Sequence, residues 1–136
     1  MVLAAALAAG LLPAADGTWI NSGGGDWSVL GNWQSDTPAL GSGSTAYFTT
    51  GSGTVSNDIP DLALLGVQLS GTGFTLAGNT LTLDAAGFIT VLGGSHTVST
   101  PLVLSGATTL TLAYGQSLTL DGGVAALAVA SGQAAS

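Results

Sequence analysis

A triplet with apolar residues at its first and third positions, and most often Thr at its centre, recurs from Leu62 to Leu120. The triplets begin at positions 62, 67, 74, 81, 89, 96, 102, 110 and 118, so those three steps apart are usually separated by 21 or 22 residues. This period matches a three-sided β-solenoid, in which three short strands form one rung and the next rung stacks about 4.8 Å above it. The spacing therefore predicts an all-β, parallel solenoid with about 21–22 residues per rung.

The triplet also predicts which side chains enter the core. Because successive side chains of a strand point to opposite faces, both apolar members face inward together and the central residue faces solvent. Thr suits the outer position, since its branched Cβ fits a pleated surface and like residues in neighbouring rungs pair without charge. The predicted outward residues are Thr75, Thr82, Thr90, Thr97, Thr111 and Thr119.

The period further predicts columns of stacked inward residues. These columns are Val67, Ile89 and Leu110; Phe74, His96 and Leu118; Leu81, Leu102 and Val124; and Leu69, Val91 and Leu112. An antiparallel sandwich is the competing architecture. In a sandwich, residues 21 or 22 apart are generally not neighbours, and Leu76 pairs across a tight turn with Leu81.

Length and composition indicate one folded domain in three segments. The chain has 136 residues, 22 of them Gly, and 46% of its residues are apolar, whereas disordered chains are polar and charged. We expect a leader over residues 1–15, a Trp-rich capping region over 16–61 and solenoid rungs, truncated at the C-terminus, over 62–136. Within the capping region, strands are expected at 18–21, 46–50 and 54–56 because these runs are β-branched or aromatic and lie between turn residues.

The charge pattern excludes two classes of partner. The chain contains no Lys, Arg or Glu, and its net charge of −7 comes from seven Asp residues. Binding to nucleic acid and anchoring by a polybasic segment both need cationic side chains, so neither is expected. The absence of Cys excludes disulfides, structural zinc and thiol catalysis.

Residues 1–15 form an uncharged apolar run that ends before Asp16. The run is shorter than the roughly 20 residues of a spanning helix and resembles the apolar core and small-residue cleavage zone of a secretory signal. A basic n-region is missing, and Pro13 lies close to a cleavage point after Ala15. A signal peptide is the favoured interpretation, and a buried helix or strand is the alternative.

The segment after residue 16 carries a more specific set of motifs. It contains Trp19, the glycines 23–25 followed by Trp27-Ser28, Asn32-Trp33, Pro38 and the strand-like Ala46-Tyr47-Phe48. With the later "LAGNTLTL", "TPLVLSG" and "GQSLTLDGG", the chain resembles secreted bacterial proteins with autotransporter-associated β-strand repeats over about residues 17–123. The resemblance implies a right-handed parallel β-helix that is secreted or displayed on the outer-membrane cell surface. The chain departs from that family in having few rungs and no C-terminal barrel or sorting signal in this sequence.

The three tryptophans allow two interpretations. Exposed aromatic rings in a polar, Gly-rich segment can stack on sugars, so Trp19, Trp27 and Trp33 are candidate glycan-binding residues. A solenoid must also cover the open core of its first rung, and bulky side chains serve that purpose. We favour the second interpretation, in which the tryptophans build an N-terminal cap.

Three further features of the sequence bear on possible sites. His96, the only imidazole, is expected to point inward as a neutral, hydrogen-bonded residue, because no Ser or Asp is framed around it as in a catalytic triad. Asp58 and Asp61 could act as acid and base on a glycoside or share a calcium ion, but Asn, Asp and Pro at 57–61 are more typical of a turn. Ice binding is disfavoured because the triplets offer one outward Thr per strand rather than Thr-x-Thr.

The sequence thus predicts a non-enzymatic extracellular or cell-surface passenger that acts as a spacer or adhesive scaffold. No catalytic, metal or cofactor-binding residue is expected. The alternatives are a carbohydrate-binding module and a β-helix glycosidase. Surface glycans or other cell-surface material are the expected partners. Self-association is also expected, because the last rung, at about 124–129, would carry an unpaired strand edge.

Overall fold

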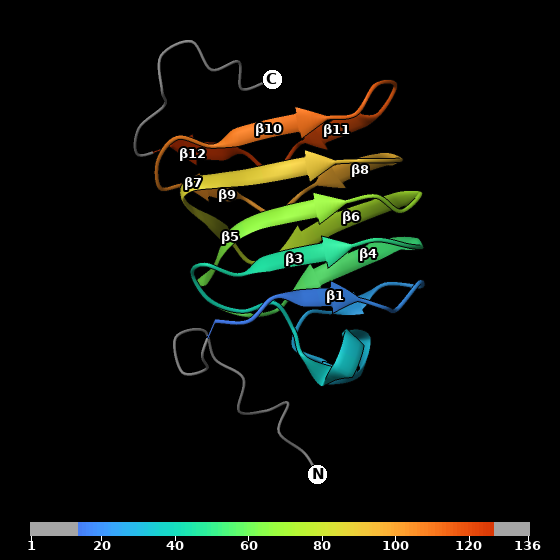
Figure 1. Ribbon diagram of the computed structural model, residues 1–136. Helices are drawn as coiled ribbons and strands as arrows, with labels where there is room; N and C mark the ends of the chain where they lie inside the picture. The colour runs from blue at the N-terminus through green and yellow to red at the C-terminus, as the bar shows by residue number, and fades with distance from the viewer. Residues whose placement is uncertain (1–13, 127–136) are drawn as a thin grey trace.

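Parallel strands wind around one axis and stack into a solenoid in the computed structural model, which describes residues 14–126 (Figure 1). The strands are β1 (Gly17–Trp19), β2 (Gly25–Asp26), β3 (Thr45–Phe48), β4 (Ser52–Asn57), β5 (Leu62–Leu69), β6 (Gly73–Gly78), β7 (Leu81–Val91), β8 (Ser95–Val98), β9 (Leu102–Leu104), β10 (Thr109–Leu112), β11 (Ser117–Leu120) and β12 (Val124–Ala126). Two short 3-10 helices, η2 (Leu30–Asn32) and η3 (Gln34–Asp36), lie between β2 and β3. None of the helices within residues 14–126 has the length and apolar character needed to cross a membrane.

The strands form three faces. Face A stacks β1, β3, the second half of β5, the second half of β7, and β10. Face B stacks β2, β4, β6, β8 and β11. Face C stacks the first halves of β5 and β7 with β9 and β12. Four regular rungs result, at residues 45–64 (rung 1), 66–83 (rung 2), 88–104 (rung 3) and 109–126 (rung 4).

The predicted register is confirmed. All of the named strands pair in parallel, and Val67 faces Ile89, which in turn faces Leu110. The other columns follow: Leu69 with Val91 and Leu112, Leu81 with Leu102 and Val124, and His96 with Leu118. Phe74 joins His96 by ring stacking, with centroids 6.0 Å apart. Leu76 pairs with Val55 and Val98 rather than with Leu81, so the sandwich alternative is wrong.

The coil is right-handed. In Figure 1, β3, β5, β7 and β10 run from left to right in front, whereas β4 and β6 return behind them as the chain climbs from bottom to top. This is the hand of nearly all parallel crossover connections, because a right-twisted strand packs back onto its sheet in that sense.

The corner between faces C and A changes length from rung to rung. One residue, Leu65, separates the two halves of β5, whereas four residues, 84–87, separate the paired halves of β7. The longer corner includes Ala86 in the left-handed region at φ 63°. Just beyond it, Phe88 lies on the outer surface of face A against the backbone of Gly66, where a Cβ would meet the Phe88 ring at 2.3 Å.

The region 14–44 that precedes the regular rungs forms the cap. β1 and β2 begin the stacks of faces A and B, and the excursion through η2 and η3 then passes beneath them, at the lower end of Figure 1. Regular stacking begins at Thr45, earlier than the predicted boundary after residue 61, because β3 and β4 pair in register with β5 and β6. Residues 1–13 of the predicted signal peptide lie outside the described residues.

Candidate functional site

The three tryptophans lie in the core of the cap and not on its surface. Trp19, Trp27 and Trp33 are at most 1% exposed. The Trp33 ring lies 5.1 Å from that of Trp19 and 5.0 Å from that of Trp27 between centroids, and each of the three lies 5.8–5.9 Å from Phe48 of rung 1. These offset and edge-on contacts are the arrangements that aromatic pairs prefer.

The indole nitrogens are also occupied. The Nε1–H groups of Trp19, Trp27 and Trp33 donate to backbone carbonyls of Asn21, Ala39 and Trp27 at 2.6, 2.8 and 2.7 Å. A sugar platform needs an accessible aromatic face, and none of these rings presents one. This burial speaks against the candidate glycan site at Trp19, Trp27 and Trp33, because contacts among the rings and with Phe48 cover their faces.

His96 lies where the sequence predicts it, inside face B of rung 3, and is 2% exposed. Its Nδ1 accepts a hydrogen bond from the Phe74 N–H at 2.9 Å, so its Nε2 carries the proton and donates to the Gly93 carbonyl at 2.6 Å. The imidazole is thus neutral and replaces a backbone acceptor at the point where the β6–β8 ladder begins. Both ring nitrogens are engaged by the fold, and neither is free for proton transfer.

The carboxylates connect successive turns of the chain. Asp58 accepts hydrogen bonds from the Ser28 N–H and Oγ–H at 2.9 and 2.5 Å, Asp16 from the Thr45 N–H at 2.8 Å, and Asp84 from the Gly43 N–H at 2.7 Å. Asp61 is exposed in a turn at φ 56°. Over residues 14–126, no three carboxylate or imidazole side chains gather into a group that could hold a metal ion.

Face B carries the most regular outer surface. Thr54, Thr75, Thr97 and Thr119 stack in one unbroken column. Ser52, Ser95 and Ser117 lie two residues before their Thr and therefore face outward as well. Strands β8 and β11 carry one outward Thr each, as predicted, and an outward Ser adds a second hydroxyl to β4, β8 and β11.

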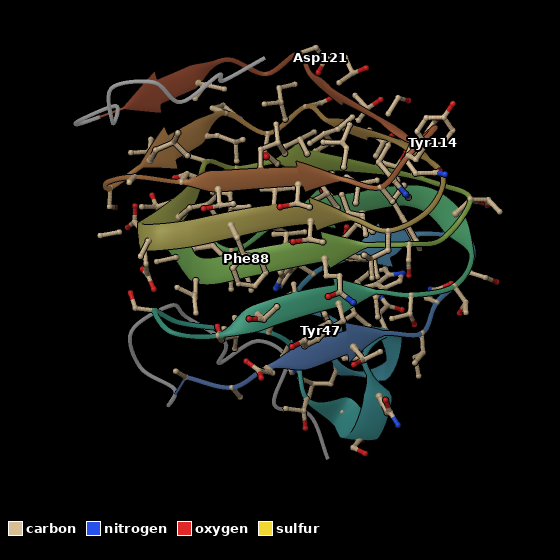
Figure 2. All side chains as sticks on the ribbon, turned by 45° about the horizontal axis from the view of Figure 1, so that its top comes forward. Tyr47, Phe88, Tyr114 and Asp121 are labelled. Carbon is tan, nitrogen blue, oxygen red and sulfur yellow. The ribbon has the colours of Figure 1, made fainter. Side chains whose placement is uncertain are left out.

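Aromatic residues on the outside are few and separated. Tyr47 and Phe88 lie on the outer surface of face A in different rungs, and Tyr114 is fully exposed on the loop between β10 and β11 (Figure 2). Phe88 covers Gly66. This surface offers one accessible ring at Tyr114 and two half-buried ones.

The last described rung leaves part of the core accessible. Leu112 is 40% and Val124 46% exposed, whereas Val91 and Leu102, the residues below them, are 0% and 2% exposed. Leu110, Leu118 and Leu120 are only partly buried. We call this surface, formed by β10, β11 and β12, the open end.

Comparison with known proteins adds no assignment: no family model, curated protein or solved structure matches this chain.

Proposed function

We propose that the chain is a structural segment of an extracellular or cell-surface protein, a non-enzymatic spacer or adhesive scaffold of the kind implied by the resemblance to autotransporter-associated repeat passengers. The observation that carries the proposal is the parallel pairing of the four rungs, face by face, above a buried aromatic cap. Such a stack makes a stiff element that grows by about 4.8 Å per rung, which suits a spacer or scaffold.

The chemistry of the proposed site candidates supports a structural role. His96 and the three tryptophans are buried and bonded to the backbone, and Asp58 is bonded to Ser28. These side chains join neighbouring turns of the chain. Their polar atoms are therefore already bonded to the protein itself. The carboxylates that remain exposed suit a surface that stays soluble through its negative charge.

A two-part experiment tests this function. Intact and fractionated cells of the source organism, probed with an antibody to the chain, should show it in the medium or at the cell surface; exclusive cytosolic labelling would refute the location. A panel of polysaccharides incubated with the purified chain should show no new reducing ends. Hydrolysis abolished by Asp58→Ala or Asp61→Ala would instead establish the glycosidase alternative.

The hydroxyl array of face B supports one second candidate, binding of ice through Ser and Thr side chains repeated at the strand spacing. Thr75→Lys would interrupt this array, and Thr82→Lys places the same half-buried change on face C of the same rung. Freezing hysteresis lost only in Thr75→Lys would support ice binding. Absence of hysteresis in the unaltered chain would exclude it.

A further inference from the structure

One outward column of face A departs from the Thr pattern in two adjacent rungs. This column begins at Thr45 and continues through Gly66 and Phe88 to Thr109. Thr therefore occupies the position in rungs 1 and 4, whereas rung 2 has no side chain there and rung 3 has a large apolar ring. The two departures are coupled, because Phe88 covers Gly66.

The Phe88 ring lies with one face on the backbone of Gly66. A Cβ at Gly66 would lie at most 2.5 Å from Cε1, Cζ and Cε2 of the ring, at nearly the same distance from all three. Such a position lies close to the axis through the ring centre, so the ring meets Gly66 with its face and not with its edge. The opposite face turns away from the sheet, and the side chain is half-buried (Figure 2). The result is a flat aromatic platform on the outside of the solenoid.

Polar side chains border this platform. Gln68 lies two residues after Gly66, about 7 Å along the strand. It pairs with Tyr47 of the rung below and with Thr90 of the rung above. All three side chains face outward and are half-buried. One amide and two hydroxyl groups thus lie beside the ring, and the strands of face A contain no carboxylate.

We propose that Phe88, Gln68 and Tyr47 form a binding site for an uncharged β-linked glucan. In such a glucan the hydroxyls and linkages are equatorial, so each sugar has C–H groups on its flat faces and hydroxyls around its rim. The C–H face complements the negative face of an aromatic ring, and the rim hydroxyls can exchange hydrogen bonds with the Gln68 amide and the Tyr47 hydroxyl. An apolar surface with a few placed polar groups is the usual composition of a small-ligand site.

Charge selects an uncharged ligand. The chain has a net charge of −7 and no Lys or Arg with which to bind an acidic sugar. This inference rests on the proposed adhesive role and names the class of ligand to which the chain would adhere.

Affinity electrophoresis in native gels tests the inference. Hydroxyethyl cellulose in the gel should retard the unaltered chain relative to a protein that binds no glycan. Carboxymethyl cellulose, an anionic form of the same backbone, should not retard it. Phe88→Ala should raise the dissociation constant by about tenfold or more, whereas Phe88→Tyr, which keeps a ring, should leave it within about threefold.

Two further variants separate the platform from other effects. Gly66→Ala keeps Phe88 but displaces its ring, so it should weaken binding as well. Tyr114→Ala is the matched control, because it removes a fully exposed ring on the loop between β10 and β11, and it should leave the dissociation constant within about twofold. Tryptophan emission shows for each variant that the cap is intact.

Three results would overturn the inference. No retardation by hydroxyethyl cellulose would show that the platform binds no glucan, and it would leave the extracellular spacer role to the cell-fractionation experiment. Equal weakening by Phe88→Ala and Tyr114→Ala would place the site elsewhere. Equal retardation by carboxymethyl cellulose would show that charge does not select the ligand.

Discussion

Replacing Trp27 by Ala should remove a large part of the stability of the chain, because this ring joins the cap to the first regular rung. Trp27 is 1% exposed, lies 5.0 Å from Trp33 and 5.8 Å from Phe48 between ring centroids, and donates a buried hydrogen bond to the Ala39 carbonyl. Truncation of a buried Trp to Ala costs about 3–5 kcal/mol, and a buried acceptor left without its donor adds about 1 kcal/mol or more. Domains of this size are stable by about 5–15 kcal/mol, so the expected loss is about half of a typical value.

Two companion variants separate packing from hydrogen bonding and from surface effects. Trp27→Phe keeps an aromatic ring and removes the Nε1–H donor, so we expect a loss of about 1–2 kcal/mol. Tyr114→Ala removes a fully exposed ring and should change stability by less than about 0.5 kcal/mol.

Urea unfolding followed by circular dichroism gives these free energies, provided that tryptophan emission reports the same transition in the unaltered chain. If Trp27→Ala lowered the free energy of unfolding by less than about 1 kcal/mol, the cap would be refuted, because removal of a ring that covers the core should cost more. Loss of binding to a glycan array in a Trp27→Ala chain of unchanged stability would revive the sugar site.

Three smaller predictions follow from single contacts and can be checked by the same unfolding assay. Gly66→Ala should destabilise the chain by about 1–2 kcal/mol because its Cβ would displace the Phe88 ring. In a Phe88→Ala background the same change should be neutral or stabilising. Additive effects of the two substitutions would contradict the contact. His96→Leu should cost about 1–3 kcal/mol by leaving the Phe74 N–H without an acceptor, and His96→Asn should recover part of that loss; equal stability of the two variants would show that the acceptor is unimportant. Thr100→Val should stabilise the chain by about 1 kcal/mol, since the buried Thr100 hydroxyl has no hydrogen-bond partner within residues 14–126, and a loss would indicate a partner.

The register of the rungs was predictable because two simple quantities determine it. Strand alternation decides that Ile89 and Val91 point inward, and the number of residues per rung decides that Val67 and Leu110 lie beside Ile89. Both quantities can be read from a single sequence. His96 was placed correctly by the same reasoning, since it occupies an inward position of its column.

The presence of a Trp-rich cap was predictable from the sequence, but its conformation was not. Its conformation depends on contacts between segments, such as the Asn21 Nδ2–H donating to the Asn32 Oδ1 at 2.8 Å, and on a left-handed Ser35 at φ 56°. No local pattern encodes these features. The burial of Trp19 likewise depends on the ring of Trp33, which lies fourteen residues later in the chain.

Phe88 shows a second limit of the sequence pattern. An apolar residue immediately before Ile89 falls on the outward side of the strand, where the triplet rule expects a polar side chain. Its neighbour one rung below is Gly66. Because Gly66 has no side chain, the Phe88 ring packs directly on the backbone there. The pairing of a large outward residue with Gly can be recognised only once the register, including the shift between Leu64 and Gly66, is known.

The lack of cationic side chains links the folding of this chain to its expected associations. With no Lys or Arg, a carboxylate can be held only by neutral donors, and Asp16, Asp58 and Asp84 accept backbone or hydroxyl hydrogens from a neighbouring coil. The backbone N–H groups that need such acceptors, those of Ser28, Gly43 and Thr45, lie in or next to the cap, where the chain does not form regular strands. Carboxylates therefore gather at the capped end, while the regular rungs above it pair through the backbone and through neutral side chains such as Asn57, Ser70 and His96. The gradient of charge that results keeps the cap solvated and leaves Asp121 as the one carboxylate of the last described rung, where Leu112 and Val124 are exposed.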